Sequence, residues 1–262
     1  MLRELFKFSQ QTGRLVSALV RPLLWLAVFA AGFRNVFGVS IVEPYDTYIP
    51  YDVYMVPGLV GMVLLFNGMQ SSLAMVYDRE MGLMRLLLTA PLPRWWILFA
   101  KLTATAVLSL VQAVAFLVVA ALLGTTLPVF GPQTPHVLLA AVASALMLGA
   151  LGLLLSVHVK QLENFAGTMN FVIFPMYFMS TALYPLWKLQ ESGAEWVYQL
   201  ARFNPFTHAV EWMRFALYDK DPGVSPYIVL GTLALCFFLA AWGYDPQRGF
   251  GALTKRGPGG PA

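Results

Sequence analysis

The sequence predicts an all-α membrane protein with six transmembrane helices and with both termini in the cytoplasm. Of the 262 residues 58% are hydrophobic and only 11% are charged, which is far more apolar than a soluble domain. Six apolar stretches are long enough, with their flanks, to cross a hydrocarbon core of about 30 Å. The proposed topology leaves only five of the 17 Lys and Arg residues outside, as the positive-inside rule requires: Arg34, Lys188, Arg202, Arg214 and Lys220.

We expect the chain to form one membrane domain, residues 1–244, followed by a flexible cytoplasmic tail, residues 245–262. The N-terminal residues 1–14 have the pattern of a short amphipathic helix at the membrane surface. The first span needs Arg21 and Arg34 to extend toward opposite interfaces, because the apolar run between them is short. The six expected spans are residues 15–37, 55–76, 96–123, 136–157, 165–184 and 226–242.

Small and polar residues inside these spans predict helix contacts. Ala141, Ala145 and Gly149 recur at intervals of four and form a small-residue stripe that permits close helix packing. Polar amides at membrane depth are costly and face protein or a cavity rather than lipid. We expect them to form hydrogen bonds between helices or, alternatively, to line a substrate path; these amides are Asn67, Gln70, Gln112 and Asn170.

A charged stretch, residues 77–101, separates the second and third spans and must lie in water. If residues 80–89 are helical, Met81, Met84 and Leu88 share one face and Arg85 projects from another. Pro91 and Pro93 then end this helix. The pattern predicts a short helix lying against the membrane or a partner protein.

This stretch resembles the cytoplasmic coupling segment of ABC-2-type exporter permeases. The matching positions are Glu80, Gly82, Leu87 and Pro91, whereas Leu83 stands where that family usually has Thr. The resemblance implies that residues 80–91 dock on a separate ATPase subunit, with Glu80 and Arg85 in charged contacts.

The segment 185–225 is too polar to span a membrane and too apolar to be a free loop. We expect two short amphipathic helices that enter the outer leaflet, with a break at Asn204 and Pro205. This pattern is similar to the re-entrant element that the ABC-2 family carries between its last two spans. Arg214 belongs to the same element.

Several other functions lack support in the sequence. No Walker-type phosphate loop is present, so we expect no ATPase activity of the chain's own and no bound cofactor. His208 and Glu211 lie three residues apart but have no third ligand nearby, so we expect no metal site. The basic residues form no run, which argues against nucleic acid as a partner. Cys236 is the only cysteine, and no catalytic residues are assigned.

The resemblance implies the membrane subunit of an ATP-driven exporter for an amphipathic or hydrophobic substrate, in a bacterial inner membrane. We expect two copies of the chain and two ATPase subunits, which bind the ATP and Mg²⁺. The alternatives are a carrier that does not use ATP, an intramembrane enzyme, or an assembly factor. The first two require ionisable groups at membrane depth, whereas every Asp and Glu falls in a loop or at a predicted span end.

Overall fold

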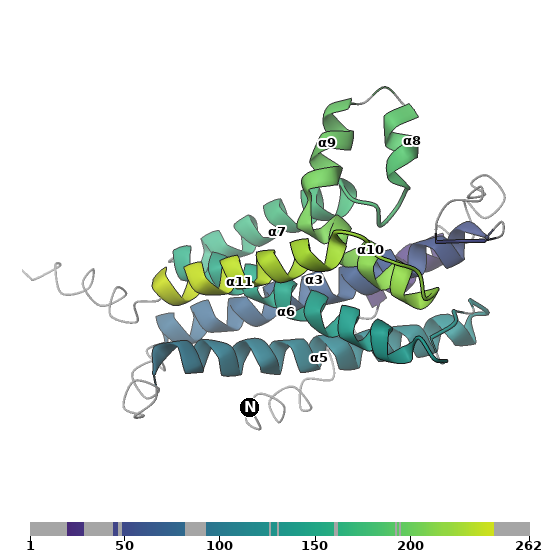
Figure 1. Ribbon diagram of the computed structural model, residues 1–262. Coiled ribbons are helices and arrows are strands. Elements are labelled where there is room, and N and C mark those ends of the chain that lie inside the picture. Colours follow the sequence, from purple (N-terminus) through teal and green to yellow (C-terminus); the bar gives the residue numbers. More distant parts are fainter. Residues whose placement is uncertain are drawn as a thin grey trace, which may run out of the picture.

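The computed structural model describes residues 20–28, 44–46, 49–81, 93–125, 127–129, 131–159, 162–191, 193 and 195–243, and within these ranges all regular elements are helices. They form a bundle of long helices from which a short helical hairpin projects (Figure 1). The helices are α3 (Tyr51–Glu80), α5 (Arg94–Leu122), α6 (Thr134–His158), α7 (Leu162–Phe178), α8 (Leu186–Glu191), α9 (Glu195–Phe203), α10 (Pro205–Leu217) and α11 (Ser225–Gly243).

Four helices are long and apolar enough to cross a membrane, and they coincide with the second, third, fourth and sixth predicted spans. Their apolar parts are Tyr51–Asp78, Trp95–Leu122, Thr134–His158 and Ser225–Gly243. The second and fourth begin two to four residues earlier than predicted. Of the first predicted span the structure describes the helical residues 20–28. The full count of six spans therefore stays a prediction.

Helix α7 is shorter than the predicted fifth span, because it ends at Phe178 and not at Tyr184. The chain turns directly afterwards, where the Ser180 hydroxyl donates to the carbonyl of Tyr177 at 2.6 Å and accepts the N–H of Ala182 at 3.2 Å. A side chain that bonds to its own backbone competes with helix continuation. The predicted boundary was wrong because apolarity alone does not report this turn.

Glycines on α3 set the spacing of the core. A Cβ atom on Gly68 would lie 2.9 Å from the carbonyl oxygen of Leu148 on α6, and one on Gly58 would lie 2.5 Å from that of Ala182. A Cβ atom on Gly152 of α6 would lie 2.5 Å from the Ser72 hydroxyl oxygen and 2.7 Å from the carbonyl oxygen of Gly68. Helix α3 can therefore touch α6 backbone to backbone, as small residues allow in membrane helices.

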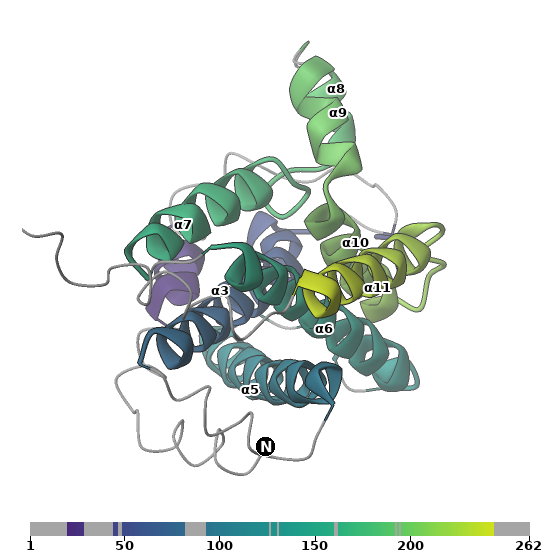
Figure 2. The ribbon, with the colours of Figure 1, turned by 90° about the vertical axis from the view of Figure 1, so that its left-hand side faces the viewer.

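Helix α6 lies at the centre and contacts α3, α5, α7, α10 and α11 (Figure 2). In the predicted small-residue stripe, Gly149 faces α5, where a Cβ atom would meet Leu102 at 2.9 Å. Ala145 is buried, and Ala141 is half-buried. The stripe is thus confirmed as a packing surface, although the tightest contact uses Gly152.

Three helices, not two, fill the segment between α7 and α11. The prediction missed the turn at Gly193, which has a φ of 72° and separates α8 from α9. Helices α8 and α9 project sideways from the bundle in both views (Figures 1 and 2). Helix α10 instead packs inside the bundle against α3, α6 and α11. The break predicted at Asn204 and Pro205 is confirmed.

The bundle has two ends that matter for function. We call the end where α3 finishes and α5 starts the coupling end, because the predicted coupling segment joins these helices. We call the opposite end, where α3, α6 and α11 begin, the far end. The predicted N-terminal surface helix, the coupling helix after Met81, and the tail after Gly243 lie outside the described residues.

Candidate functional site

At the coupling end an ion pair joins α3 to α5. The ammonium of Lys101 lies 3.1 Å from the Asp78 carboxylate, and the two side chains are only 19% and 15% exposed. Glu80 is the last residue of α3. The other predicted coupling residues, Gly82, Arg85, Leu87 and Pro91, lie outside the described part of the chain. The ion pair therefore holds together the two helices that the predicted coupling segment connects.

Two of the four predicted amides face the same level of the bundle. Counting from the ion pair, Asn67 precedes Asp78 by 11 residues and Gln112 follows Lys101 by 11 residues, on antiparallel helices. At a rise of 1.5 Å per residue, this is about 16 Å. That depth is near the middle of a hydrocarbon core of about 30 Å. Asn67 and Gln112 thus mark the midplane on α3 and α5.

These midplane amides are buried but lack partners. Gln112 is 1% exposed, and neither its side-chain nitrogen nor its oxygen has a hydrogen-bond partner among the described residues; the same holds for the amide nitrogen of Asn67. The interhelical hydrogen bonds that we considered are therefore not seen for these atoms. Gln70 is half-buried, and Asn170 is exposed on α7. The four amides do not form one cluster.

Asn204 fixes the start of α10. Its side-chain oxygen accepts the N–H of Phe206 at 3.0 Å and caps the helix, and Pro205 occupies the first helical turn. Its side-chain nitrogen donates to the carbonyls of Met176 at 2.7 Å and Met179 at 2.8 Å. One side chain thereby joins the end of α7 to the start of α10.

Arg214 is the most deeply buried charge in the described part of the chain, with 2% of its surface exposed. Its guanidinium pairs with Glu211 one turn earlier and donates to the carbonyl of Thr181 at 2.9 Å. It also lies over the ring of Tyr54, 4.0 Å from the ring centre. Arg214 thus connects α10 to α3 and to the turn after α7.

The charge of Arg214 is compensated locally. Burial alone would lower its pKa, but the neighbouring Glu211 carboxylate raises the pKa of Arg214 overall, so the guanidinium stays protonated. Tyr45 stacks edge-on against Tyr218, with ring centres 4.9 Å apart. The sequence did not predict that Tyr45, Tyr54 and Thr181 surround Arg214, because these residues come from segments far apart in the chain.

The fold and these sites define a polytopic helical membrane protein whose polar residues gather at both ends and at the midplane. The chain matches the family described as ABC-2 type transporter over residues 1–218, and it belongs to this family. It is a transport permease, a membrane subunit and not itself an enzyme.

Curated relatives agree with this assignment. The chain is 30% identical over 217 residues to a protein of Porphyra purpurea named "Putative transport permease ycf38". The aligned region covers 81% of this chain and 70% of the relative. A protein of the same name from Cyanophora paradoxa is 31% identical over 224 residues, covering 82% and 72%.

Proposed function

We propose that this chain is the membrane subunit of an ATP-driven exporter for an amphipathic or hydrophobic substrate. Residues 80–91 would dock on a separate ATPase subunit, with two copies of each chain in the complex, in a bacterial plasma membrane. The ATPase subunits would hold the ATP and Mg²⁺, since this chain carries no phosphate-binding loop. ABC-2 permeases generally pair with such a subunit.

The observation that carries the proposal is the ion pair of Asp78 and Lys101. A docked subunit that moves residues 82–92 pulls on the C-terminus of α3 and on the N-terminus of α5. Because the ion pair clamps these ends together, the two helices would move as one unit relative to α6. Helix α3 also contacts α7 and α10, so its motion would reach the far end.

The midplane amides provide a reason for such a motion. A buried polar group without a partner costs about 1 to 3 kcal/mol. Asn67 and Gln112 therefore disfavour this conformation and favour one in which α3 and α5 separate enough to admit water or cargo. In this proposal they line the substrate path in the alternate state, together with the half-buried Gln70.

Charge reversal at the ion pair tests the coupling proposal. We would measure ATP hydrolysis by the permease–ATPase complex in proteoliposomes, relative to the ATPase subunit alone. Asp78→Lys and Lys101→Asp should each leave the ATPase subunit bound but remove the stimulation by the permease. The double variant restores opposite charges at the same two positions, so it should recover the stimulation. Wild-type stimulation in both single variants would contradict the proposal.

A further inference from the structure

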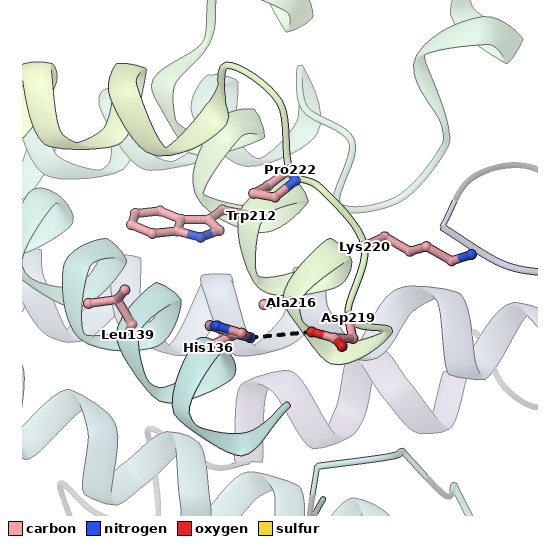
Figure 3. A pocket seen from close by; sticks show the side chains of 7 residues that line it. All are labelled: His136, Leu139, Trp212, Ala216, Asp219, Lys220 and Pro222. Atoms are coloured by element: carbon pink, nitrogen blue, oxygen red, sulfur yellow. Dashed lines mark ion pairs between the residues drawn. The ribbon is translucent and has the colours of Figure 1, made fainter. Parts of the chain in front are cut away.

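A pocket of about 280 Å³ opens at the far end, between the start of α6 and the end of α10. Its apolar wall consists of Leu139, Trp212, Ala216 and Pro222, and its rim carries His136, Asp219 and Lys220 (Figure 3). This volume is below the range of about 300 to 1,000 Å³ that encloses a whole drug-sized ligand. The pocket therefore suits a small headgroup with its tail outside.

Trp212 provides a hydrogen-bond donor inside the pocket. Trp212 is only 7% exposed. Its indole N–H has no acceptor among the described residues. Figure 3 shows the ring nitrogen on the side of the ring that faces His136. An indole can only donate, and this N–H is not fully buried, so it is accessible to a ligand in the pocket. The pocket thus presents a donor for an acceptor group such as a phosphate or ester oxygen.

Asp219 places a negatively charged carboxylate at the rim of the pocket. Its backbone has a left-handed conformation, which glycine adopts with less strain. Helix α10 ends in a Schellman motif, in which the N–H of Lys220 donates to the carbonyl of Phe215 at 3.1 Å and that of Asp219 to Ala216 at 3.4 Å. Asp219 takes the left-handed position with a φ of 53°. One carboxylate oxygen lies 3.3 Å from His136, and the other is without a partner in the described structure.

The surroundings of the pocket place it at the boundary between hydrocarbon and water. Leu138 and Leu139, in the first two turns of α6, are 59% and 58% exposed, whereas the 219–221 connection is charged. Lys220 contributes its stem to the rim, and its ammonium bonds to Asp46 at 3.1 Å. Because Lys220 is paired with Asp46, the Asp219 carboxylate remains at the rim, so the pocket suits a zwitterion, whose cationic group can pair with Asp219, better than an anion.

We propose that this pocket binds the headgroup of an ethanolamine phospholipid. The phosphate would accept from the Trp212 indole N–H, and the primary ammonium would donate to Asp219, whose carboxylate also contacts Nδ1 of His136. An acyl chain would then run along the exposed leucines of α6. A choline headgroup fits less well, because its methylated nitrogen has no N–H to donate. This inference needs the protein to span a membrane but does not need the ATPase coupling to be correct.

Native mass spectrometry of the detergent-purified chain tests the proposal, with ethanolamine, choline and glycerol phospholipids of identical acyl chains. The ethanolamine lipid should bind about tenfold more tightly than the choline lipid, as one hydrogen bond to a charged group predicts. Equal affinities, or tightest binding of the glycerol lipid, would overturn the assignment.

Two variants separate the phosphate contact from the ammonium contact. Trp212→Phe should weaken the ethanolamine and choline lipids alike, by about tenfold, because both share the phosphate. Asp219→Gly should abolish the preference for ethanolamine without lowering the unfolding temperature, since glycine relieves the positive φ. The matched control is Trp242→Phe, an exposed tryptophan at the coupling end of α11 that should change nothing. Unchanged lipid binding in Trp212→Phe and Asp219→Gly would refute the site.

Discussion

The charge on Arg214 is tolerated because of one carboxylate, and this can be measured. Removing one partner of a buried ion pair leaves the other uncompensated, at about 3 to 5 kcal/mol. Arg214→Met should therefore destabilise the protein strongly, and adding Glu211→Gln should recover much of the loss. Thermal unfolding in detergent gives both values. Additive losses would show that the two side chains do not depend on each other.

Replacing Gln112 should increase the stability of the protein, unlike replacing Arg214, because the Gln112 amide is buried without a partner. Gln112→Met keeps the length of the side chain and removes the polar atoms, so the free energy of unfolding should rise by about 1 kcal/mol. If the amide serves the substrate path, permease-stimulated ATP hydrolysis in proteoliposomes should fall in the same variant. A variant that is less stable than the wild type would show that the amide has a structural partner.

At the scale of single residues, four unusual residues could be identified from the sequence: Arg214, Asn204, Asn67 and Gln112. The residues that each of them contacts could not be predicted. A polar residue in an apolar run can be recognised from the sequence. Its partners cannot, since Thr181 and Tyr54 approach Arg214 only after α3, α7 and α10 have packed. The pocket at Trp212 was missed for the same reason, because α6 and α10 are separated by more than 45 residues.

Helix packing depends on which glycines meet a neighbour. Gly68→Ala places a Cβ atom 2.9 Å from a backbone oxygen of α6 that cannot easily move, so we expect a loss of about 1 to 3 kcal/mol. Gly231→Ala on α11 has open space around it and should stabilise by about 0.5 to 1 kcal/mol, because alanine favours the helix. Thermal unfolding of the two variants compares them directly, and equal shifts would contradict the packing described here.

The helices themselves were largely predictable, because long apolar runs with few charges become spans whatever their neighbours. The ends of α5 and α11 agree with the predicted boundaries to within two residues. Boundaries failed where side chains bond to the local backbone, as at Ser180. The position of α10 inside the bundle was also unpredictable, since its amphipathic pattern fits a membrane surface equally well.

At the scale of the whole molecule, we expect α7 to pack against a second copy of the chain. Asn170 and Phe171 are exposed side by side, Phe171 at 80%, and an amide at membrane depth is costly against lipid. In a Cys236→Ala background, Asn170→Cys should therefore form cross-linked dimers in membranes. The matched control, Phe238→Cys on the exposed face of α11, should stay monomeric. Cross-linking of both variants to the same extent would contradict a specific interface.

The most direct test of the central claim is whether a separate ATPase subunit binds residues 80–91. Gly82→Trp, and Glu80→Ala combined with Arg85→Ala, should be compared with Gly231→Trp, which adds the same bulk at an open position on α11. The account predicts that the wild type and Gly231→Trp purify from membranes with equal numbers of permease and ATPase chains. It predicts that the coupling-segment variants insert normally but that the amount of ATPase purified with them falls by about tenfold or more. Full retention of the ATPase by these variants, or its absence from the wild type, would contradict the account.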